Sequence, residues 1–192
     1  MNDRLDKALG LMNRVFRAIA KKPDELRINV ERSAGVVEVT LVANPADTRR
    51  LVGKGADTLK QLAILFRLLA RDSGRAVRLC DLIPNRNPEP PFEPYSPNPE
   101  WPREEVEALL RDLTEAVFEA PVIVTTEAHT DFSVKMYASV QADLEGNRAL
   151  GVFDKAVNVI FIPVGTGVGM KVYAHVHDWK KVREGTATAS GR

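Results

Sequence analysis

The spacing of apolar residues in the first 82 positions predicts a short series of helices and strands. Apolar residues recur every three or four positions between residues 3 and 20, which is typical of an amphipathic helix, and Pro23 ends it. Strict alternation of apolar and polar residues then predicts two strands, over 26–30 and 37–41. The turn at 33–35 joins them as a hairpin.

The next stretch favours helices again. Asn44-Pro45 is a helix start, with Asn as the cap and Pro at the first helical position. Gly53 and Gly55 interrupt this helix early, and an apolar stripe from Leu59 to Leu69 gives the following helix its buried face. Apolar residues from position 77 begin a third strand. The predicted order is helix, strand, strand, short helix, glycine loop, helix, strand.

Residues 83–102 differ in composition from both flanking regions. Eight prolines fall in this segment, which excludes a helix interior or a central strand and favours an extended, fairly stiff connector. We therefore predict a proline-rich linker at 83–102 between a first domain at 1–82 and a second domain at 103–179. The small polar residues of 180–192 predict a disordered tail.

After the linker the pattern of the first domain returns, which indicates an internal repeat. A helical stripe at 106–117 is followed by strands near 122 and 132–138, an apolar stretch from 152 and a strand at 172–176. The two halves align with an offset of 93 to 95 residues. Identity between them is slight, so the repeat depends on the order and spacing of the elements.

The segment Val157–Ile162 fits two structures. Its β-branched and aromatic residues favour a strand, with the glycine-rich 165–169 as a hairpin turn. Its apolar residues, together with Phe153, also fit the i, i+3, i+4, i+7 spacing of a helix, and the repeat requires a helix here. We predict a helix, followed by a turn at 165–169.

Charge is unevenly distributed although the formal net charge is only +1. Residues 46–78 contain eight Lys or Arg against three Asp, a net of +5, whereas residues 98–131 have a net of −7. The basic block surrounds the glycine loop and favours an anionic partner there. A solvated helix face explains the same charges equally well.

Composition also limits the class of protein. A single cysteine excludes an internal disulfide. The charged N-terminus lacks the apolar core of a signal peptide, and we identify no apolar run of membrane-spanning length. We expect a cytoplasmic protein without a membrane partner.

The glycine loop carries the clearest chemistry. Glycines allow tight backbone geometry and close approach by another molecule. The N-terminus of the helix behind the loop offers N–H groups and the positive end of the helix dipole, which together suit a phosphate. Lys54 adds a mobile positive charge at the tip. The loop is therefore suited to holding an anionic backbone.

The stretch Val52–Lys60 and the element order around it resemble a KH domain of the prokaryotic type (type II), most closely the small single-KH RNA-binding proteins of bacteria. The resemblance covers roughly residues 3–82 and implies an α+β fold in the order α-β-β-α-α-β, with a three-stranded sheet packed by helices. In that family a Gly-x-x-Gly loop clamps about four nucleotides. The repeat extends this to two tandem KH-like domains. Ala56 stands where the motif has its last glycine.

The resemblance implies a set of RNA-binding residues. In the first domain these are Arg49, Arg50, Val52, Gly53, Lys54, Gly55, Ala56 and Lys60. In the second domain the aligned candidates are Gly146, Asn147, Arg148 and Ala149. The second set departs further from the motif and has acidic neighbours, so we interpret that copy as degenerate and suited to packing or protein contact.

Other signals are weaker. His175 and His177 share one side of a strand, but no third zinc ligand is placed by the sequence. No paired carboxylates or Ser/His arrangement stands out, so we expect no catalytic residue, metal or cofactor. The sequence thus predicts a non-catalytic protein that binds single-stranded RNA. The alternative is a structural or adaptor protein that uses degenerate KH-like domains for protein contact.

Overall fold

The computed structural model describes residues 3–84, 98, 100–144 and 147–178, and for 80–84 it describes the backbone alone. Over these residues the fold is α+β, with five α-helices and two three-stranded mixed sheets. Most of the predicted linker 83–102, and the whole of the predicted tail 180–192, lie outside the described residues.

The first unit follows the predicted element order and adds two short 3-10 turns. Its elements are α1 (Asp3–Ile19), η1 (Pro23–Glu25), β1 (Arg27–Ser33), β2 (Val36–Ala43), α2 (Pro45–Val52), η2 (Lys54–Ala56), α3 (Asp57–Ala70) and β3 (Ala76–Pro84). The sheet order is β1-β2-β3, with β1 antiparallel and β3 parallel to β2. Parallel neighbours need a crossover connection, and α2 and α3 provide it.

The second unit repeats this sheet topology with one helix fewer. Its elements are α4 (Arg103–Phe118), β4 (Val122–Thr130), β5 (Ser133–Val140), α5 (Arg148–Gly167) and β6 (Lys171–Asp178). The predicted second α-β-β-α-α-β order is corrected here to α-β-β-α-β. Only residues 141–147 separate β5 from α5, whereas 44–56 separate β2 from α3, so the second connection is too short for an equivalent of α2.

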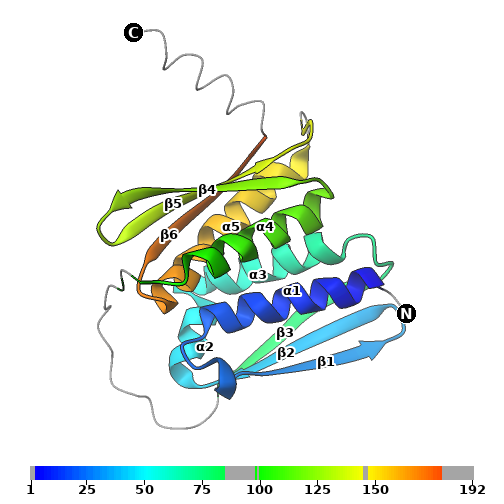
Figure 1. The fold of residues 1–192 in the computed structure, drawn as a ribbon. Coiled ribbons are helices and arrows are strands. Elements are labelled where there is room, and N and C mark those ends of the chain that lie inside the picture. The colour runs from blue at the N-terminus through cyan, green and yellow to red at the C-terminus, as the bar shows by residue number, and fades with distance from the viewer. Residues whose placement is uncertain (1–2, 85–97, 99, 145–146, 179–192) are drawn as a thin grey trace, which may run out of the picture.

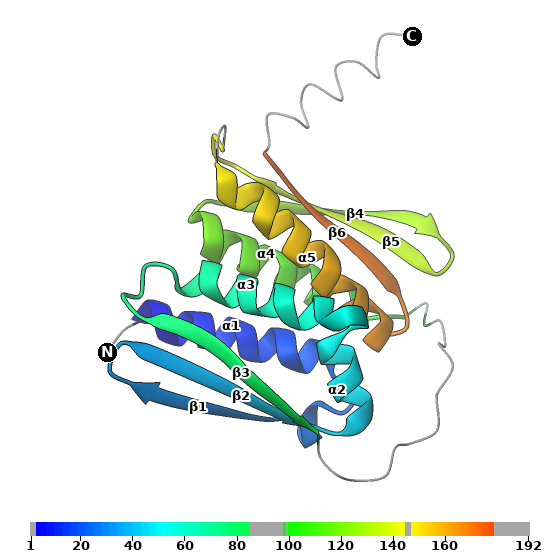
Figure 2. The same cartoon turned by 180° about the vertical axis from the view of Figure 1, so that it is seen from behind.

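The two sheets form the outer layers of the molecule, and the helices lie between them (Figures 1 and 2). Helices α1 and α3 cover the sheet of the first unit, and α4 and α5 cover the sheet of the second. The helices of the two units face each other in the middle. Helix α2 lies to one side, next to the start of α3.

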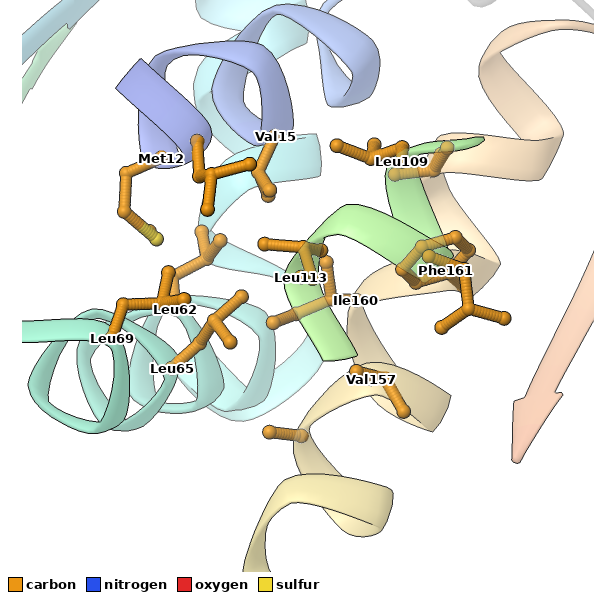
Figure 3. Close-up of a cluster of buried hydrophobic side chains, with 14 of the residues drawn as sticks. Met12, Val15, Leu62, Leu65, Leu69, Leu109, Leu113, Val157, Ile160 and Phe161 are labelled. Atoms are coloured by element: carbon orange, nitrogen blue, oxygen red, sulfur yellow. The ribbon is translucent and has the colours of Figure 1, made fainter. Parts of the chain in front are cut away.

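A shared hydrophobic core fills the space between the helical layers. Figure 3 shows Met12 and Val15 of α1 and Leu62 of α3 beside Leu113 of α4 and Ile160 of α5. All five are buried, and they belong to one continuous cluster that extends into both units. Burial of this apolar surface is the main force that holds the units together.

Salt bridges join arginines of α1 to Asp112 of α4 and to Glu119, which directly follows α4. Arg14 lies 2.5 Å from Asp112, and Arg4 lies 2.5 Å from Glu119. Part of the negative charge of residues 98–131 is therefore compensated by the first unit. Because these side chains remain partly exposed, each bridge contributes little stability.

The prediction of a helix at 157–162 is confirmed. Helix α5 runs without interruption through these residues and includes Pro163. Phe153, Val157 and Ile160 are fully buried, because the helical spacing places them on the face that packs against α3 and β6. Packing of one apolar face therefore outweighs the strand propensity of the individual residues.

The predicted turn at 165–169 is shorter than expected. Gly165, Thr166 and Gly167 are the last residues of α5, and the turn begins at Val168. A methyl group at Gly165 would lie 2.4 Å from the carbonyl oxygen of Met170. This glycine therefore allows the helix end to pack closely on the strand that follows.

The expectation that no segment matches a membrane span needs one amendment. By length and composition alone, α5 is apolar enough to cross a membrane. Its apolar residues on one face are buried in the core, including Phe153, Ala156, Phe161 and Val164. Core burial accounts for the apolar character of that face without a bilayer.

Candidate functional site

The glycine loop lies between the end of α2 and the start of α3. Asn44 caps α2, since its side-chain oxygen accepts a hydrogen bond from the Asp47 N–H at 2.9 Å. Helix α2 ends at Val52, where the Gly53 N–H donates to the Arg49 carbonyl at 2.8 Å. The single 3-10 turn η2 then leads into α3. The loop is thus short and anchored by a helix on each side.

Three residues of this loop have left-handed backbone conformations. The φ angles of Gly53, Gly55 and Ala56 are 71°, 62° and 62°. Ala56 is one of two non-glycine residues with positive φ in the described chain, the other being Glu119. A left-handed conformation costs an L-residue about 1–2 kcal/mol. Ala56 therefore adopts a glycine-like backbone conformation despite its methyl group.

Gly53 and Gly55 are needed for different reasons. A methyl group at Gly53 would lie 2.2 Å from Oγ1 of the buried Thr58, so no side chain fits there. At Gly55 a methyl group would meet no atom within 4 Å, and only the left-handed φ favours glycine. Gly53 therefore sets the internal packing of the loop, whereas Gly55 faces open space.

The outer side of the loop is exposed and basic. Lys54, Gly55 and the neighbouring Arg49 are exposed. The exposed Lys60 donates from Nζ to the Gly55 carbonyl at 3.1 Å. Three exposed cationic residues thus lie in the turn or within five residues of it, while Val52 and Ala56 are half-buried.

The first turn of α3 has no side-chain cap. Ala56 occupies the N-cap position and offers no acceptor for the N–H groups behind it. The Asp57 N–H already donates to the Lys54 carbonyl within η2. The N–H groups that follow it point outward and carry the positive end of the helix dipole, so they attract an anionic oxygen. Asp57, which is exposed in the same turn, is the acidic residue closest in sequence to this end.

Arg50 does not belong to this exposed group, contrary to the sequence-based expectation. Its Nε donates to the carbonyl of Ile19 at 2.8 Å, and its Nη2 donates to the carbonyl of Pro163 at 2.7 Å. Burial lowers the pKa of Arg50, and the nearby Asp47 carboxylate opposes this change. Arg50 therefore links α2 to the ends of α1 and α5, and we exclude it from the RNA-binding set.

Neighbouring groups complete the anchorage around Arg50. The buried Asp47 accepts hydrogen bonds from the backbone N–H groups of Lys21 at 2.8 Å and Lys22 at 3.1 Å. A methyl group at Gly167 would lie 2.9 Å from Arg50 Nη2, so glycine leaves room for the guanidinium. The base of the loop is therefore fixed to both units.

The rest of the basic block only partly converges on the loop. Arg67 is exposed on α3. Arg75 donates to the carbonyl of Ser33, Arg71 contacts Asp72, and Arg78 lies 3.7 Å from Glu38. The basic character at the loop therefore depends on Arg49, Lys54 and Lys60.

In the second unit, the helix start that aligns with the glycine loop is capped by a side chain. Gly146 lies outside the described residues. Asn147 is the N-cap of α5 and its side-chain oxygen accepts from the Ala149 N–H at 2.9 Å. Arg148 is exposed, and Ala149 is partly buried. Because this helix start is already capped, it offers a weaker anion site than the start of α3.

The histidines form an aromatic row on the outer face of the second sheet. The rings of His175 and His177 are 6.1 Å apart, and both stack on Tyr137. His175 Nδ1 lies 3.8 Å from Asp154. Among the described residues no three His, Cys, Asp or Glu are grouped as a metal site.

No protein-family model and no curated protein matches the chain. The interpretation of the loop therefore depends on its geometry and on the sequence resemblance described above.

Proposed function

We propose that this chain is a non-catalytic RNA-binding protein that grips single-stranded RNA through the loop Gly53–Ala56. The observation that carries the proposal is the exposed turn Lys54–Gly55, set before the uncapped start of α3. The element order of the first unit, α-β-β-α-α-β, agrees with the KH resemblance of the sequence. We propose a KH-like role for this unit on these two grounds.

Each group around the loop has a distinct part in the proposed contact. The backbone of Lys54 and Gly55 lets a phosphate approach, because Gly55 has no side chain to obstruct it. Arg49, Lys54 and Lys60 neutralise phosphate charge. Three phosphate contacts to a single strand give a slope of about −2 for the logarithm of affinity against the logarithm of salt concentration.

Backbone contacts carry no sequence information, so the proposed site has only modest sequence preference. The half-buried Val52 and Ala56 provide apolar surface beside the loop for a base to contact. The second unit contributes by packing, because its helix start is capped and its helices share the core with α1 and α3.

The direct test is the double variant Lys54→Asp, Gly55→Asp. An aspartate fits at residue 55, because the space there is open and Asp tolerates left-handed φ better than most residues. We expect the variant to keep its fold and to lose retention of single-stranded RNA on a filter or in a gel-shift assay.

A matched control separates the loop from net charge. Lys155→Asp with Gly35→Asp makes the same charge change at an exposed lysine and at a left-handed glycine with open space, φ 82°. We expect the control to bind RNA close to wild-type affinity. Equal binding by both double variants would contradict the loop assignment and favour the adaptor alternative.

A further inference from the structure

Strand β1 is an outer strand of the first sheet and lies largely in solvent. The order β1-β2-β3 leaves one side of β1 without a strand partner. Every residue of β1 except Ile28 is exposed. An edge strand presents backbone N–H and C=O groups to which a further strand can bind.

Two of the three charged residues of β1 are not compensated within the described chain, whereas Arg32 pairs with a carboxylate of α1. Arg27 and Glu31 have no ionic partner among the described residues. Glu31 lies opposite Glu38 in the strand register, and Glu38 is already close to Arg78. Like charges opposite each other are unfavourable. Arg27 and Glu31 are about 13 Å apart along the strand, which is too far for them to pair.

These charges become complementary when two copies of β1 pair antiparallel. With Asn29 of each copy on a twofold axis, Arg27 lies opposite Glu31 of the second copy, and the reverse pair forms by symmetry. We propose that two copies of this chain associate through β1 in this register. The two three-stranded sheets then form one sheet of six strands.

The apolar face of β1 fits the same register. Ile28 lies opposite Val30 of the second copy on the side that faces the helices. Val30 is 39% exposed, and both residues line a groove of about 770 Å³ between β1 and α1. Leu9, Met12 and Phe16 of α1 form part of the other wall. Pairing through β1 brings two such grooves together across the axis and removes apolar surface from water.

The equivalent edge of the second unit lacks this complementarity. Glu127 of β4 lies opposite Lys135 of β5, so its charge has a partner within the sheet. Thr126 of β4 also bonds to Glu107 of α4 at 2.5 Å. The formal net charge of +1 adds little repulsion between copies. The proposal therefore depends on the charges and apolar residues of β1 and not on a property that all edge strands share.

The test measures the association state of the full chain by sedimentation equilibrium over a wide concentration range. We expect a reversible dimer for the wild type. Arg27→Glu places Glu opposite Glu, and Glu31→Arg places Arg opposite Arg, so each variant alone should weaken dimerisation about tenfold. Glu104→Arg and Lys155→Glu make the same charge changes at exposed positions outside β1, and we expect no effect.

Mixing the two single β1 variants is the decisive experiment. At positions 27 and 31 the Arg27→Glu chain carries two acidic residues and the Glu31→Arg chain carries two basic residues, so an equimolar mixture should form a heterodimer. One chain with both changes should form a homodimer again. Thermal unfolding shows whether each variant is folded. If a single variant does not fold, the double variant Arg27→Ser, Glu31→Gln is measured in its place, and we again expect weaker association than for the wild type. A monomeric wild type, a dimer insensitive to the single changes, or no recovery in the mixture would overturn the proposal.

Discussion

The two units have the same sheet topology, yet they differ in the connection that enters their long helix. In the first unit this connection contains α2 and three left-handed residues, and α3 begins without a side-chain cap. In the second unit a short segment leads to Asn147, which caps α5. The same frame thus leaves one helix start without a side-chain cap and caps the other.

The largest expected effect comes from comparing Gly53, which the fold requires, with Gly151, which it does not. Gly53→Ala forces a methyl group against Thr58 at positive φ, and we expect a loss of about 3 kcal/mol in unfolding free energy. Gly151→Ala, within α5 and in open space, should instead raise stability by about 0.5–1 kcal/mol. Urea denaturation measures both. A neutral Gly53→Ala would mean that the loop is not packed as described.

The next effect compares two adjacent arginines. Arg50→Ala removes the hydrogen bond to Ile19 within the first unit and the one to Pro163 that joins the two units, and we expect a loss of about 2 kcal/mol in stability. Arg49→Ala, on the exposed side of α2, should cost less stability but weaken RNA binding. Denaturation and RNA titration of both variants check this division. Equal effects of the two variants on stability and binding would contradict it.

The smallest effect concerns the closed helix start. Asn147→Ala removes the cap of α5, and we expect a loss of about 1 kcal/mol in unfolding free energy with RNA affinity unchanged. Thermal denaturation and the same RNA titration measure the two quantities. If this change weakened RNA binding without unfolding the chain, the second unit would have to be part of the RNA interface.

Local patterns predicted most of the elements. The helical spacing of Phe153, Val157 and Ile160 identified α5 correctly, because the same periodicity determines which residues are buried. The alternation in β2 and the start signal Asn44-Pro45 likewise agree with the structure. A strand also forms at β1, but only Ile28 in it is partly buried. These features depend on neighbours in sequence, which is why the sequence alone predicts them.

Features that depend on distant residues were missed. Arg50 looks like its neighbour Arg49 in the sequence, and its partner Pro163 lies 113 residues away. The second unit has no described equivalent of α2 because the connection between β5 and α5 is short. Aligning the two halves at a constant offset did not reveal this difference in length. Asn147 did carry a signal, since Asn before a helix is a preferred cap, but the alignment equated it with Lys54.

The most direct test of the proposed RNA site at the start of α3 is to follow backbone amide resonances by NMR while single-stranded RNA is added. We predict that the shifts concentrate at Lys54, Gly55 and the first turn of α3, and that those of Ala149 and its neighbours at the start of α5 stay unchanged. Shifts centred on α5, or none at the loop at saturating RNA, would contradict the account.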